Sequence, residues 1–132
     1  MINQKAQSVV EFLLVILLLM FVLIGIVDFS RAWYFANSLN MAAREGARMA
    51  TVTEGLAVDD PRIKTRVEDT LKPMIQPTDL KVSVIFTSPV KTGDPITVEA
   101  INDFHFWYGK LFRRTDLSVS LKGKSAMRYE MN

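Results

Sequence analysis

The stretch FLLVILLLMFVLIGIV, Phe12–Val27, contains no charged residue and consists mostly of large apolar residues. Extended to residues 9–29, it reaches the length of about 20 residues at which a helix crosses a bilayer core. A secretory signal peptide is the competing interpretation, but its apolar part usually has about 7 to 15 residues and ends at a small-residue cleavage site. Here the run is followed by DFSRAWYFANSL, which continues the helical pattern. We therefore predict a transmembrane segment over residues 9–29.

The helical pattern continues well beyond this segment. No proline occurs before Pro61, and residues 7–52 are rich in good helix formers. A helix of about 45 residues is about 65–70 Å long, whereas a bilayer core takes about 30 Å, so half of it must leave the membrane. This outer half carries small residues at helical spacing, which allow helices to approach closely. The residues expected to pack in this way are Ala36, Ala43, Gly46, Ala47 and Ala50.

Residues 53–132 predict a small head of the α+β class. Asp60 and Pro61 are a helix start signal, and the apolar residues of the following segment recur every four positions until Pro73. Alternating patterns then indicate three strands, around residues 80–87, 96–101 and 117–122, and SAMRYEMN extends the last one past Gly123. We expect a three-stranded antiparallel sheet with the short helix on one face.

Composition excludes several function classes. Sixteen Lys and Arg against fourteen Asp and Glu give a net charge of +2, without the basic excess of a nucleic-acid binder. No cysteine is present, so a disulfide or thiolate metal site is excluded. His105 is the single histidine, and no catalytic triad spacing or phosphate-binding loop occurs. We expect no enzyme, no cofactor and no metal site, and a strand position without chemical role for His105.

The segment FHFWYGKLFRR, residues 104–114, has two interpretations. Its alternation places one aromatic row in the core, and the basic loop that follows can simply be solvated. Alternatively it forms an interaction tip, where aromatic and basic side chains contact a partner, a sugar or a lipid surface. The candidate tip residues are Trp107, Lys110, Phe112, Arg113 and Arg114, together with Leu111.

Glu11 stands directly before the apolar run, which is unusual for a carboxylate. A first-turn acid gains about 0.3–1 kcal/mol from the helix dipole and can reach water at the headgroups. An ionisable residue at the edge of a membrane span can also mark a partner or a function. The residues alone leave both interpretations open.

The segments QSVVEF, GIVDFSRAWY and AAREGAR, within residues 7–52, together with AMRYE near the C-terminus, resemble TadE-like proteins. These are minor pilins or pseudopilins of tight-adherence (Tad) pili and are related to type IV pilins. The resemblance implies a non-enzymatic pilus component that packs through its N-terminal helix, with other pilin subunits, membrane lipid and the pilus assembly platform as partners. It also implies a role in cell adhesion and no contact with nucleic acid.

The resemblance further implies that a prepilin peptidase removes a leader, residues 1–6, by cutting between Ala6 and Gln7. Glu11 then takes the fifth mature position, where the family's glutamate neutralises the N-terminal amine of a neighbouring subunit. Two residues depart from the family pattern: Ala6 stands where glycine is usual, and Leu17 where proline is frequent. Without that proline the membrane helix should be straighter.

The family topology implies a single pass through the cytoplasmic membrane with the head outside, or a place in an extracellular pilus. The positive-inside rule points the other way, because Lys5 precedes the span while Arg31, Arg44 and Arg48 follow it. An alternative function is that of a single-pass ligand-binding or sensor protein whose extracytoplasmic head acts through residues 104–114.

Overall fold

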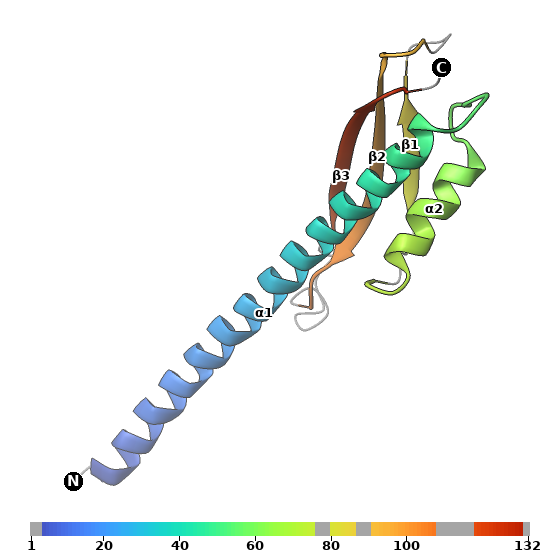
Figure 1. Cartoon of the computed structure of the whole chain (residues 1–132). Helices are drawn as coiled ribbons and strands as arrows, with labels where there is room; N and C mark the ends of the chain where they lie inside the picture. The colour runs from blue at the N-terminus through green and yellow to red at the C-terminus, as the bar shows by residue number, and fades with distance from the viewer. Residues whose placement is uncertain (1–3, 76–79, 87–90, 108–117, 131–132) are drawn as a thin grey trace.

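The computed structural model describes residues 4–75, 80–86, 91–107 and 118–130. Its elements are, in chain order, α1 (Gln4–Thr51), α2 (Pro61–Leu71), β1 (Lys81–Ile85), β2 (Pro95–His105) and β3 (Ser118–Arg128). Figure 1 shows α1 as a long rod whose second half lies against the other elements, while its first half extends away from them. The predicted α+β class and the long N-terminal helix are confirmed.

The three strands form one antiparallel sheet in the order β1-β2-β3. Alternate residues of β2 face the core, and Ile96, Val98 and Ala100 are fully buried there, as the alternating pattern predicts. β2 is longer than the predicted residues 96–101, whereas β3 continues past Gly123 as predicted. The sheet continues along β2 to His105 and along β3 past Gly123 to Arg128.

The short helix α2 begins where the start signal predicts. The side chain of Asp60 accepts a hydrogen bond of 2.9 Å from the backbone N–H of Arg62, and Pro61 occupies the first helical turn. Its apolar face, Ile63, Val67 and Leu71, is fully buried.

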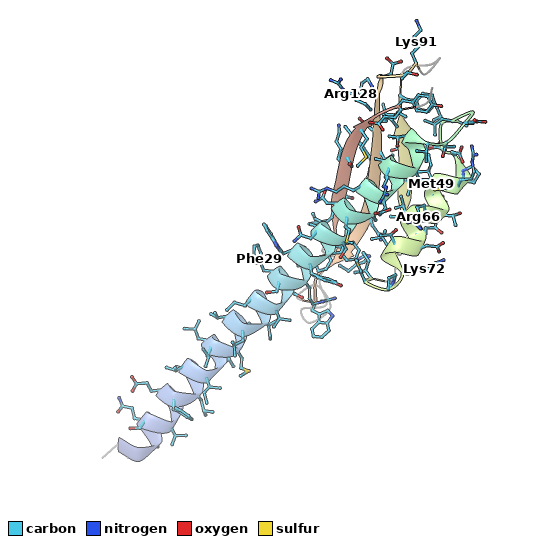
Figure 2. All side chains as sticks on the ribbon, viewed as in Figure 1. Phe29, Met49, Arg66, Lys72, Lys91 and Arg128 are labelled. Carbon is cyan, nitrogen blue, oxygen red and sulfur yellow. The ribbon has the colours of Figure 1, made fainter. Side chains whose placement is uncertain are left out.

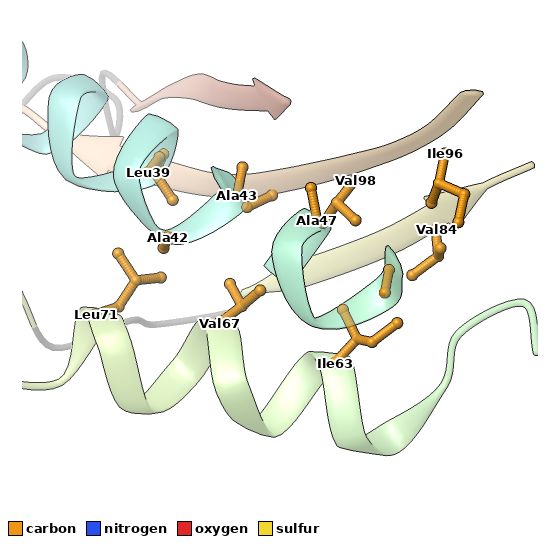
Figure 3. Packing of buried hydrophobic residues seen from close by; sticks show 12 residues of the cluster. Leu39, Ala42, Ala43, Ala47, Ile63, Val67, Leu71, Val84, Ile96 and Val98 are labelled. Atoms are coloured by element: carbon orange, nitrogen blue, oxygen red, sulfur yellow. The ribbon is translucent and has the colours of Figure 1, made fainter. Parts of the chain in front are cut away.

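The sheet is covered mainly by α1 rather than by α2 alone. The second half of α1 packs on β2 and β3, and α2 lies beside α1. Figure 3 shows the apolar side chains of α2 pointing toward the alanines of α1, with Val84 and Val98 of the sheet nearby. The expectation of a short helix on one face therefore needs a correction, because α1 supplies most of that layer.

Candidate functional site

The first half of α1 is apolar and exposed along its length. Most large apolar side chains between Val9 and Val27 keep 37% to 66% of their surface accessible. A contiguous apolar surface of this size needs lipid or protein to cover it. In the part of the chain that the structure describes, α1 is the one helix long and apolar enough to cross a membrane. It is a candidate membrane anchor.

The predicted processing residues and Glu11 lie together near the start of this anchor. Ala6, Gln7, Val10, Glu11 and Leu14 line one shallow groove on the surface of α1. Their spacing of three and four residues places them on one face of the helix. Glu11 is exposed on this face, and the bond between Ala6 and Gln7 lies within helical backbone. The groove therefore brings the predicted cut and the predicted docking carboxylate within little more than one helical turn of each other.

The small residues of α1 lie mostly inside the chain's own core. Ala43, Ala47 and Ala50 have no exposed surface, and a β-carbon at Gly46 would lie 2.7 Å from a methyl group of Val67 and 3.2 Å from one of Val98. These four positions let α1 approach α2 and the sheet closely, and they offer no surface to another subunit's helix. Ala36 is half-buried, and its predicted role in helix packing stays a prediction.

A polar pair marks the junction between the free half of α1 and the head. Asp28 is 2% exposed, and one of its carboxylate oxygens lies 3.2 Å from a guanidinium nitrogen of Arg31. The guanidinium carbon of Arg31 lies 5.5 Å from the ring centre of Phe104 and 4.9 Å from that of Trp107. The end of β2 is therefore tied to α1 through one arginine that contacts both rings.

The predicted interaction tip is described only at its first residue. Trp107 is 58% exposed, as a contact residue would be. Lys110, Phe112, Arg113 and Arg114, with Leu111, lie outside the described residues. His105, two residues before Trp107, is exposed at the end of β2.

No arrangement for metal binding occurs in the described part of the chain, where no three His, Asp or Glu residues gather around a common point. The side chains that meet in the core of the head are apolar, and ion pairs lie at its surface.

Two features of this region were not predicted from the sequence. The contact between Arg31 and Trp107 joins residues that are far apart in the sequence, and no local pattern indicates such a contact. Asn102 is 1% exposed on the core face of β2, and neither polar atom of its side chain has a hydrogen-bond partner in the described structure. The alternation of β2, continued past Ala100, would have placed this amide in the core.

A long N-terminal helix with a free apolar half and a small α+β head packed on its second half defines a candidate membrane-anchored protein. Residues 6–48 match the family model of TadE-like proteins. The predicted resemblance to this pilin-related family of Tad pili is thus confirmed over the N-terminal segment, and the match supports a Tad pilus-associated, pilin-like role. Comparison with curated proteins and with solved structures finds no match.

Proposed function

We propose that this chain is a minor pilin or pseudopilin, a non-enzymatic component of a Tad pilus. The observation that carries the proposal is the division of α1 into two halves. The second half belongs to the core of the head, whereas the first half exposes an apolar surface that lipid covers before assembly and other pilin helices cover afterwards. The match over residues 6–48 spans this exposed half and supports the same conclusion.

A prepilin peptidase in the membrane cuts the chain between Ala6 and Gln7 in this proposal. The cut removes residues 1–6 and leaves Gln7 with a free amine at the start of the anchor. Ala6 is small, as the family's usual glycine is. The exposure of both residues on the free half of α1 supports access by the peptidase.

Glu11 is the docking residue of the proposed assembly step. Once covered by lipid or by another helix, a carboxylate without a counter-charge costs up to a few kcal/mol. The N-terminal amine of a neighbouring subunit supplies a counter-charge of the right sign. The groove of Glu11 also contains Gln7, so each subunit presents its amine and its carboxylate on one face.

The head lies outside the cytoplasmic membrane in this topology, and the platform of the pilus machinery extracts the subunit from the lipid. A reporter enzyme fused after residue 132 distinguishes the two orientations. The proposal expects activity from a periplasmic reporter such as alkaline phosphatase, whereas activity from a cytoplasmic reporter alone contradicts this orientation.

The role of Glu11 is tested by Glu11→Gln, which keeps the size of the side chain and removes its charge. We expect normal amounts of protein in the membrane but no pilus incorporation, measured by blotting sheared pili against membranes. Glu45→Gln is the matched control, because Glu45 lies on the same helix but pairs with Arg66 in the head at 3.3 Å. Incorporation of Glu11→Gln at the control level would contradict the docking role.

A further inference from the structure

Four exposed aromatic side chains lie at about the level where α1 meets the head. They are 53% to 68% exposed, and we call them the junction aromatics: Phe29, Trp33, Tyr34 and Trp107. The rings of Phe29 and Trp33 stack with their centres 6.4 Å apart. Figure 2 shows Phe29 projecting from α1 just below the head. Three of these residues belong to α1, but Trp107 lies two residues after the end of β2.

The height of Trp107 above the apolar span follows from its contact with Arg31. The guanidinium carbon lies 4.9 Å from the ring centre, so both side chains occupy about the same level along α1. Arg31 follows Val27, the last residue of the apolar run, by one helical turn, or about 5–6 Å. The polar layer on each side of a bilayer core is about 5–8 Å thick. Trp107 therefore lies within this layer when the span is inserted.

The chemistry of the junction fits this layer. Tryptophan and tyrosine favour the membrane–water interface, because their rings are apolar and carry one polar group. The side chain of Arg31 is 41% exposed, and guanidinium groups bind phosphate through paired N–H donors. Asp28, which pairs with Arg31, is buried and hardly reaches the surface.

We propose that the head rests on the outer leaflet of the membrane before assembly, with Trp107 embedded among the lipid headgroups and Arg31 bound to a lipid phosphate. The proposal rests on the anchor role of α1. It assigns a second lipid contact, from Trp107 just after β2, which fixes the depth of the span and the rotation of the head about α1. The occupant of this surface is the phospholipid headgroup layer.

Trp33 and Trp107 are the two tryptophans of the chain, so single substitutions isolate each one. The full chain is reconstituted in vesicles of phosphatidylcholine and phosphatidylglycerol. Bromine atoms on the phosphatidylcholine chains lie either just below the headgroup or near the bilayer centre. Trp33→Phe reports on Trp107, and Trp107→Phe reports on Trp33. For both we expect roughly twofold stronger fluorescence quenching by the shallow bromines, as for residues of an interfacial belt.

The two reporters separate this inference from the anchor role. If lipid bromines quench Trp33 but not Trp107, the head does not contact the headgroup layer and the proposal is wrong. The role of α1 as a membrane anchor is then still supported. No lipid quenching of either tryptophan contradicts both. If Trp107 is shielded from aqueous iodide but is not quenched by lipid, another protein copy covers it and the proposal is wrong.

Arg31→Gln in the Trp33→Phe background tests the arginine separately. We expect Trp107 to become more accessible to iodide, because the contact that holds it at the headgroup level is lost. Trp33 in the matching Trp107→Phe background should keep its depth. Unchanged iodide accessibility of Trp107 would overturn the role given to Arg31.

Discussion

Gly123 of β3 lies directly against the backbone of Leu39 in α1. A β-carbon at residue 123 would overlap the carbonyl group of Leu39 and crowd the backbone N–H of Asn40. The side chain of Asn40 accepts a hydrogen bond of 3.3 Å from the backbone N–H of Lys124 at the same place. The helix and the sheet therefore approach each other closely where β3 has no side chain.

Gly123→Ala should strongly destabilise the head. Backbone cannot move aside as a flexible side chain can, so we expect a loss of about 3 kcal/mol or more, the upper end of overpacking effects. Chemical unfolding of the detergent-solubilised full chain, followed by near-ultraviolet circular dichroism, measures the loss. Lys122→Ala, on the exposed face of the same strand, should stay within about 0.5 kcal/mol of the parent. Equal stability of the two variants would contradict this packing.

Asn102 should be replaceable by an apolar residue of similar size with a gain in stability. The buried amide has no hydrogen-bond partner in the described structure, and such a group costs about 1–3 kcal/mol. We expect Asn102→Leu to raise the free energy of unfolding by about 1–2 kcal/mol. Asn102→Asp should lower it, because a charge would then be buried. A loss of stability in Asn102→Leu would show that the amide has a partner after all.

The stability of the α2 start should depend on pH. The hydrogen bond from the Arg62 side chain lowers the pKa of Asp60 below its ordinary 3.8, against the opposing effect of burial. A carboxyl with a lower pKa in the folded state stabilises the fold above the unfolded pKa, and this contribution is lost as the pH falls through the folded value. The loss therefore occurs below about pH 4.

Thermal melting between about pH 6 and pH 2 checks this expectation against Asp60→Asn. Asparagine still caps the helix, so the variant should lose the pH dependence due to this carboxyl and keep most of the cap. Asp60→Ala should lose about 1 kcal/mol at neutral pH as well, because the cap itself is removed. Parallel melting curves for the parent and Asp60→Asn down to pH 2 would contradict the shift.

The second half of α1 should be required for the head to fold. The core contains Leu39, Ala42, Ala43, Ala47 and Ala50 from this helix beside the apolar residues of α2 and the sheet. A fragment of residues 28–132 retains this core and should unfold cooperatively. A fragment of residues 53–132, the predicted head alone, loses one wall of the core and should remain unfolded. Cooperative unfolding of the shorter fragment would show that α1 contributes little.

The elements with strong local signals could be predicted from the sequence. Continuous helix formers indicate α1, the cap and proline mark the start of α2, and alternation indicates the strands. The predicted end of β2 at residue 101 is too early, because the polar Asn102 interrupts the apolar pattern just where the strand continues.

The contacts that each element makes with the rest of the fold could not be predicted from local patterns. Gly46 and its neighbouring alanines indicate close approach, but spacing along one helix does not say whether the approaching surface belongs to the same chain. Arg31 and Trp107 meet because the antiparallel sheet returns the end of β2 to the base of the head. That contact depends on the folded arrangement and not on either local segment.

Our central proposal is that α1 is the processed assembly helix of a Tad pilin. Mass spectrometry of the N-terminal peptide tests it most directly, on protein purified from the membranes of cells that also express a Tad prepilin peptidase. The account predicts a peptide that begins at Gln7 and carries a methylated amine. A peptide that still contains residues 1–6, in cells where the same peptidase processes a major pilin, would contradict it.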